Sequence, residues 1–161
     1  MPVKLGAAAV PWTVPTGFRN NNAVRKGSAA MTIALSWFAA LAVLLALDTV
    51  WLGFAARALY TDVLGPLMLD GFRLVPALVF YPLHIAGVCV FVVPKAAARP
   101  LPVAGYGAFY GLCVYGAYDL TNHAVLKVWT TQLTVVDMAW GALVTAAAAS
   151  MAAWVQRRRA R

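Results

Sequence analysis

Long apolar runs separated by short polar segments dominate this chain. A spanning helix needs about 17–25 predominantly apolar residues, and four runs meet that need: residues 31–54, 74–93, 101–118 and 133–155. They are too long and too uniformly apolar for the alternating strands of a membrane barrel. Because a bilayer core holds no water for exposed amides, each run is expected to be helical. The pattern predicts an all-α integral membrane bundle of four transmembrane helices.

The composition agrees with a membrane protein and excludes an ordinary soluble domain. Hydrophobic residues make up 63% of the chain and charged residues 11%, against about 45–50% and 25% in typical globular proteins. The net charge of +8 raises nucleic acid as a partner. The charges lie in tails and short loops, however, so we expect a lipid bilayer as the partner and no nucleic acid.

The basic residues alternate in number from one loop to the next. Three lie in the first and third loops, Arg57, Arg73 and Lys127; the other ten precede the first run, lie between the second and third, or follow the fourth. The positive-inside rule then places both termini in the cytoplasm. Residues 156–161 form a basic cytoplasmic tail.

The first 30 residues differ from the rest. They are rich in Ala, Pro, Asn and Gly and show no apolar periodicity, which predicts a disordered basic tail before the four-helix domain of residues 31–155. Met31 opens the first run directly, so translation starting there is the alternative interpretation.

Two carboxylates inside the apolar runs are the candidate catalytic residues, Asp48 and Asp137. An ionised carboxylate at a membrane helix centre costs roughly 2.5–3.5 kcal/mol, and such groups usually face a protein interior or a wet cavity. Both lie near the non-cytoplasmic ends of their helices, so they could line one cavity. The alternatives are that Asp137 bonds free amides at a helix start and that Asp48 only accepts a hydrogen bond from a neighbouring helix.

Polar and aromatic side chains at the same depth are the candidate substrate-binding residues. Trp51 and Trp140 each follow an aspartate by three residues, Tyr81 lies in the second run, and Tyr118, Asp119 and Asn122 end the third. Two alternatives remain, namely an interfacial belt of tyrosines and a cap by Asp119 or Asn122 on a short surface helix.

Metal and cofactor signals are weak. No C-x-x-C, H-E-x-x-H or P-loop spacing occurs, and the two histidines, His84 and His123, are too few for a convincing centre. We expect no metal and no cofactor. His84 lies deep in the second run, where it is either a packing residue or the floor of the outer cavity.

Four strings, taken in order, resemble the DUF2177 family of small bacterial predicted membrane proteins. They are LDTVWLG (47–53), ALVFY (77–81), GLCVYGAYDLTN (111–122) and VDMAWG (136–141). The resemblance implies a multi-pass protein of the bacterial cytoplasmic (inner) membrane, with the outer side periplasmic. It carries no activity with it.

Two function classes follow from these residues. The first is a membrane enzyme or binding protein for a lipid or other apolar molecule, with Asp48 or Asp137 as general acid or base. The second is a small proton-coupled transporter that works as a homo-oligomer, although it would need acidic groups reachable from both sides. The first class is favoured, and a structural or accessory membrane subunit remains a third interpretation.

Overall fold

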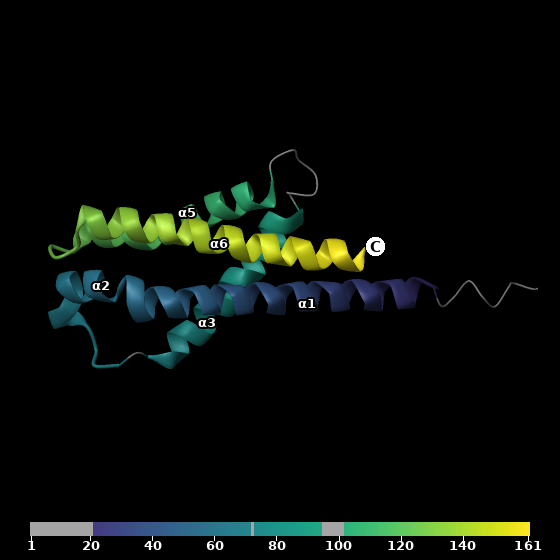
Figure 1. Ribbon diagram of the computed structural model, residues 1–161, viewed down its shortest axis with the longest axis horizontal. Helices are drawn as coiled ribbons and strands as arrows, with labels where there is room; N and C mark the ends of the chain where they lie inside the picture. The colour runs from purple at the N-terminus through teal and green to yellow at the C-terminus, as the bar shows by residue number, and fades with distance from the viewer. Residues whose placement is uncertain (1–20, 72, 95–101) are drawn as a thin grey trace, which may run out of the picture.

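Helices account for all the regular structure that the described residues contain. The computed structural model describes residues 21–71, 73–94 and 102–161. Its elements are α1 (Asn21–Val50), η2 (Trp51–Ala55), α2 (Arg57–Leu64), η3 (Gly65–Leu67), α3 (Leu74–Gly87), η4 (Val88–Val92), α5 (Val103–Val125) and α6 (Thr131–Arg159) (Figure 1). The predicted all-α class is confirmed.

The first helix starts earlier than the apolar pattern predicted. Residues 21–30, which the composition assigned to the tail, form the first turns of α1. Ala, Arg and Lys in this stretch favour a helix, so the chain is helical before the apolar run starts at Met31. The remainder of the expected tail, residues 1–20, lies outside the described residues, as does most of the expected loop containing Lys95 and Arg99.

Three helices of the described chain are both long and apolar enough to cross a membrane: Gly27–Phe54, Leu74–Val92 and Thr131–Arg159. Helix α5 has 23 residues and so is about 34 Å long at 1.5 Å per residue, but glycines and tyrosines make it less apolar. The predicted third span ended at Tyr118, whereas α5 continues to Val125. Asp119 and Asn122 therefore lie inside that helix, and neither caps a separate surface helix.

The long helices alternate in direction (Figure 1). Helices α1 and α6 run side by side and antiparallel, α5 runs along α6, and α3 crosses behind α1. The short helix α2 and the α5–α6 connection lie together, and we call this the α2 end of the bundle. The start of α1 and the C-terminus lie at the opposite end.

Helices α5 and α6 form the closest pair in the bundle because glycines line their contact. A Cβ atom built on Gly107 would lie 2.9 Å from the Cβ of Ala149, and one built on Gly111 would collide with the Gly141 carbonyl. Small residues allow such close backbone approach, which is how helices associate in lipid where burial of apolar surface gives no driving force. The G-x-x-x-G spacing in α5 thus marks its packing face against α6.

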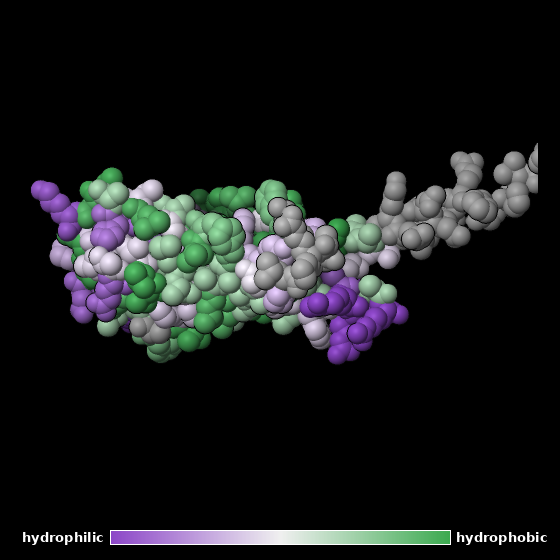
Figure 2. Space-filling model, turned by 90° about the horizontal axis from the view of Figure 1, so that it is seen from above, coloured by the Kyte–Doolittle hydropathy of each residue, from purple (hydrophilic) through white to green (hydrophobic). Residues whose placement is uncertain are grey.

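Large apolar side chains cover the outside of the bundle. The side chain of Phe54 is 82% exposed, that of Val75 71% and that of Val125 75%. Water-soluble proteins rarely expose so many large apolar side chains together in one continuous patch. Figure 2 shows hydrophobic residues over the middle of the visible face and hydrophilic residues gathered toward its two ends. This distribution suits a protein whose middle contacts lipid and whose ends contact water.

Candidate functional site

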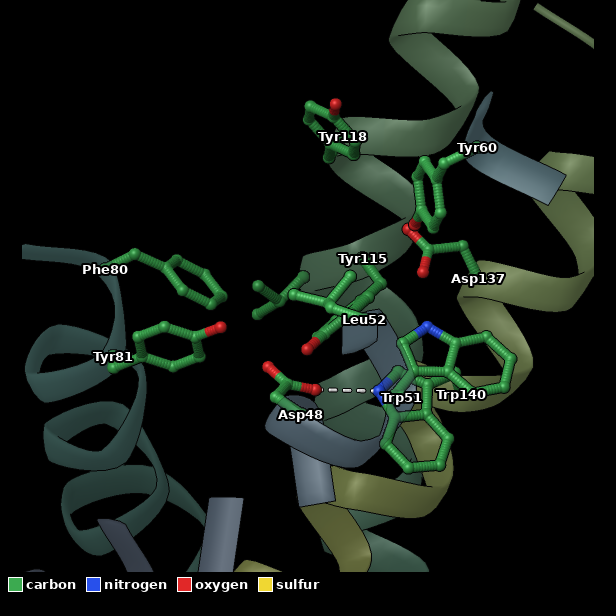
Figure 3. Close-up of a pocket in the computed structure, with 11 residues that line it drawn as sticks. Asp48, Trp51, Leu52, Tyr60, Phe80, Tyr81, Tyr115, Tyr118, Asp137 and Trp140 are labelled. Atoms are coloured by element: carbon green, nitrogen blue, oxygen red, sulfur yellow. Dashed lines mark hydrogen bonds between the residues drawn. The ribbon is translucent and has the colours of Figure 1, made fainter. Parts of the chain in front are cut away.

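A pocket of about 380 Å³ lies among the helices close to the α2 end. Every long helix contributes to it, together with α2 and the π-helical turn η2. Its lining residues are Asp48, Trp51, Leu52, Tyr60, Phe80, Tyr81, Val114, Tyr115, Tyr118, Asp137 and Trp140 (Figure 3). The turn η2 supplies Trp51 and Leu52, and π-helical turns are frequent at functional sites.

The predicted catalytic candidate Asp48 is held by a tryptophan of another helix. Its side chain is 5% exposed, and its Oδ1 accepts a 2.8 Å hydrogen bond from Nε1 of Trp140. Trp51, one turn after Asp48, stacks on Trp140 with ring centroids 4.4 Å apart and planes 5° from parallel. The two D-x-x-W segments therefore meet across the α1–α6 contact.

Asp137 faces the same interior. It is 5% exposed, and Figure 3 shows the Tyr60 hydroxyl beside its carboxylate. The alternative role for Asp137 at a helix start is wrong, because α6 begins at Thr131 and Thr130 caps it by accepting the Leu133 amide at 3.2 Å. Asp137 lies a turn deeper, where the backbone amides already have helical partners.

Tyr60 reaches the pocket from α2, outside the spanning helices. Burial raises the pKa of its phenol above the ordinary value, and the adjacent Asp137 charge raises it further. The hydroxyl therefore keeps its proton across the physiological range and is available as a donor to Asp137. No sequence signal pointed to Tyr60, because it lies in a connecting segment with no D-x-x-W or apolar pattern.

Aromatic residues of α3 and α5 complete the walls. Phe80 and Tyr81 point from α3 into the space in front of Asp48 (Figure 3). Tyr115 lies directly over Gly141, where an added Cβ would collide with its ring. Tyr118 is 54% exposed at the rim and packs edge-on against Trp129.

Two predicted binding residues lie outside the lining. Asp119 is fully buried, and neither carboxylate oxygen has a hydrogen-bond donor among the described residues. Its side chain lies close to that of Asp137, and a hydrogen bond between the two acids would need a proton on one of them. Asn122 is half-buried one turn beyond Tyr118 and is not among the pocket residues.

His84 lies below the pocket floor and does not line it. Its Nε2 is 3.0 Å from Oγ1 of Thr145, while Nδ1 is buried with no partner among the described residues. The ring packs against Phe80 and Tyr115. This geometry agrees with the packing role better than with the role of cavity floor. Among the described residues, no three His, Cys, Asp or Glu side chains are grouped to hold a metal ion.

Six of the eight predicted site residues line this one pocket: Asp48, Trp51, Tyr81, Tyr118, Asp137 and Trp140. The structure brings these residues together in one place, and their chemical roles remain predictions. The other five lining residues were not predicted as site residues: Leu52, Tyr60, Phe80, Val114 and Tyr115. All of these except Tyr60 lie within the strings that carry the family resemblance, but nothing in the sequence separates them from the other apolar and aromatic positions of those strings.

Comparison with known protein families decides the membership of this chain. The model of DUF2177, described as a predicted membrane protein, matches residues 33–154. The chain belongs to this family. It is therefore a membrane protein of an uncharacterised family, and the suspected resemblance is confirmed. No curated protein and no solved structure matches the chain.

Proposed function

We propose that this DUF2177 protein binds an amphiphilic molecule in the pocket at the α2 end and acts on the polar part of that molecule through Asp48 and Asp137. The observation that carries the proposal is the pocket itself, in which two buried carboxylates from different helices face one space lined by aromatic side chains. Predominantly apolar pockets with a few convergent polar groups are the default binding sites of proteins.

The two carboxylates suit proton transfer. A buried aspartate with neutral neighbours is a candidate general acid or base, because small changes around it alter its proton affinity. The neighbours of Asp48 are Trp140 and Tyr81, both neutral donors. Asp137 lies beside Tyr60, whose hydroxyl can relay or hold a proton. Substrate positioning is assigned to the aromatic lining residues.

The topology that supports this function has four spans with both termini in the cytoplasm of a bacterial inner membrane. Helix α5 supplies the remaining span, which is the third in chain order. Its length of about 34 Å exceeds the hydrocarbon core of about 30 Å, and Gly107, Gly111 and Gly116 face α6 rather than lipid. Four arginines, Arg157, Arg158, Arg159 and Arg161, lie at the end opposite the pocket. The pocket then opens at the periplasmic leaflet.

A proton-coupled transporter is supported less well. The chain has five acidic residues, Asp48, Asp62, Asp70, Asp119 and Asp137, and all of them belong to the half of the bundle nearer the α2 end. A pathway for protons needs ionisable groups reachable from both sides of the membrane. At the opposite end, the side chains of α1 and α6 are joined by a hydrogen bond from Gln156 to Ser36, and neither residue is acidic.

Lipid extracts of a deletion strain, compared with its parent, test the proposal. The variant Leu52→Trp fills the pocket with a larger side chain and leaves both carboxylates in place. Val50→Trp is the matched control. Leu52 is 50% exposed and Val50 58%, and Val50 does not line the pocket. We expect an altered lipid in the deletion strain that the wild type and Val50→Trp restore and Leu52→Trp does not.

Two outcomes would contradict the proposal. Unchanged lipids together with altered tolerance to a solute would favour the transporter. Unchanged lipids with loss of another membrane protein from the deletion strain would favour an accessory subunit. In both cases, Leu52→Trp should behave like Val50→Trp if the pocket has no ligand.

A further inference from the structure

The pocket contains acidic groups and no basic ones. Of its eleven lining residues, Asp48 and Asp137 carry carboxylates, and none is Lys, Arg or His. The polar groups around Asp48 are an indole and a phenol, and those around Asp137 are two more such groups and the buried Asp119. Buried charges in proteins are ordinarily paired with an opposite charge or a metal ion, so this site lacks the positive partner that its carboxylates call for.

The walls present aromatic faces to the same space. Seven of the eleven lining residues are aromatic: Trp51, Tyr60, Phe80, Tyr81, Tyr115, Tyr118 and Trp140. The Trp51–Trp140 stack forms one wall beside Asp48, while Phe80 and Tyr81 approach from α3 on the other side (Figure 3). Aromatic faces attract cations through the ring quadrupole, most strongly where water is excluded, and cages of such rings bind organic ammonium groups.

The rim of the pocket faces the lipid-exposed surface. Leu52 is 50% exposed, Phe80 38% and Tyr118 54%, and they come from η2, α3 and α5. An apolar tail leaving the pocket between these elements would run into the surrounding acyl chains. The volume of about 380 Å³ is enough for a polar head and a short part of the tail.

We propose that the pocket binds a lipophilic ammonium compound, with its cationic head between the aromatic walls and the two carboxylates and its apolar tail in the outer leaflet. This inference rests on the proposed function, because it specifies the class of amphiphile that the same site would take. Anionic head groups, such as phosphates and sulfates, would meet uncompensated carboxylates and no cation. A neutral polyol head would find hydrogen-bond partners but would leave the carboxylates unpaired.

The test compares three probes with the same decyl chain and different heads: decyltrimethylammonium, decyl sulfate and decyl glucoside. Each is titrated into the full chain purified in a neutral maltoside detergent, with binding followed by tryptophan fluorescence. We expect the ammonium probe to bind at least about tenfold more tightly than the others, the factor expected from a desolvated cation–aromatic contact. The net charge of +8 favours the sulfate everywhere else on the protein, so non-specific attraction works against the expected order.

Variants place the binding in the pocket. Tyr118→Leu removes one aromatic face at the exposed rim, and Asp48→Asn removes a charge while keeping an acceptor for Trp140. Tyr106→Leu is the control, since Tyr106 is a half-buried tyrosine of the same helix outside the pocket. We expect Tyr118→Leu and Asp48→Asn each to weaken ammonium binding by about threefold or more, within the range for partly desolvated contacts, and Tyr106→Leu to leave it unchanged.

The outcomes separate this inference from the proposed function. If the glucoside or sulfate probe binds as tightly as the ammonium probe and responds to Tyr118→Leu, the pocket is an amphiphile site but the cationic class is wrong. If none of the three binds saturably, the proposed function fails as well. Ammonium binding that is indifferent to both pocket variants would place the probe elsewhere and overturn the inference.

Discussion

The indole nitrogen of Trp140 donates a 2.8 Å hydrogen bond to Oδ1 of Asp48, and this contact joins two helices whose bonded residues lie 92 positions apart in sequence. It gives a buried carboxylate a fixed orientation toward the pocket. It also places Trp140 against Trp51, one turn beyond Asp48. Trp140 thus positions a candidate catalytic group and, together with Trp51, forms an aromatic wall of the pocket.

Loss of this hydrogen bond should destabilise the protein. Trp140→Phe keeps an aromatic ring on Trp51 but removes the donor, and a buried acceptor left without its partner costs about 1–3 kcal/mol. We expect a drop of that size in the free energy of unfolding, measured by denaturant titration in detergent. Trp154→Phe is the control, because Trp154 is 51% exposed near the C-terminus and should change little.

A double-mutant cycle isolates the contact itself. With Asp48→Leu already present, Trp140→Phe should cost clearly less than in the wild type, because the acceptor is gone. An equal cost in both backgrounds would show that the loss comes from packing of the larger indole and not from the hydrogen bond.

The α5–α6 contact should be intolerant of larger side chains at its glycines. In Gly111→Ala, the new methyl group would collide with the Gly141 carbonyl and lie 2.6 Å from Oγ1 of Thr145, so the helices must move apart. We expect a cost of about 1–3 kcal/mol, the usual range for overpacking, seen as a lower melting temperature in detergent. Gly27→Ala is the control, since nothing lies within 4 Å of a Cβ there; equal melting temperatures for the two variants would refute the close contact.

The apolar pattern was enough to predict the helical class and most of the helix positions, because long apolar runs in a membrane have few alternatives to a helix. It placed the end of α5 too early at Tyr118, since polar residues at a membrane surface look alike whether the helix continues or stops. It also missed Tyr60. Which side chains of separate helices meet depends on helix rotation and packing, and the spacing within one helix does not encode these.

Asp48 and Asp137 were predictable as a pair for a physical reason. A carboxylate in an apolar helix is costly unless it faces the interior, so two at similar depth are expected to share a space. The same reasoning applied less well to Asp119 and Asn122, which lie at the polar margin where exposure costs nothing. Their orientation was therefore undetermined by sequence, and the structure buries Asp119 completely behind the pocket.

Burial of Asp119 predicts an unusual response to its amide replacement. Asp119 has no donor among the described residues and lies close to Asp137, so a hydrogen bond between the two acids forms only when one of them carries a proton. In Asp119→Asn the amide donates to Asp137 with no proton required, which removes the cost of burying a second acid. We expect thermal stability in detergent to be equal to or higher than that of the wild type.

Asp119→Leu provides the contrast for this prediction. Leucine has no amide or carboxyl group that could donate a hydrogen bond to Asp137. This variant therefore leaves Asp137 without a partner at position 119 and should lower the melting temperature. If the asparagine variant is as unstable as the leucine variant, Asp119 does not interact with Asp137 in the way described.

The topology can be checked with reporter fusions. Fluorescent protein fused after Arg161 should be active, because the folded reporter forms only in the cytoplasm. Alkaline phosphatase inserted within residues 62–70 or 122–127 should also be active, because the proposed topology places those segments in the periplasm. A periplasmic C-terminus would leave the bundle with an odd number of spans and remove α5 from the membrane. An inactive phosphatase at both insertion sites would show that the protein has the opposite orientation, with the pocket at the cytoplasmic leaflet.

The last prediction separates a functional Asp48 from a structural one. Asn at this position keeps an oxygen that accepts from Trp140, so Asp48→Asn should reach nearly wild-type abundance in the membrane, whereas Asp48→Leu leaves the indole without an acceptor and should lower stability by about 1–3 kcal/mol. If Asp48 exchanges a proton with the ligand, Asp48→Asn should fail to restore the wild-type lipid pattern when it is expressed in the deletion strain. An amide cannot act as a base at neutral pH. Asp62→Asn, an exposed change in α2, should restore it fully. Restoration by Asp48→Asn with failure of Asp48→Leu would mean that Asp48 only holds Trp140 in place.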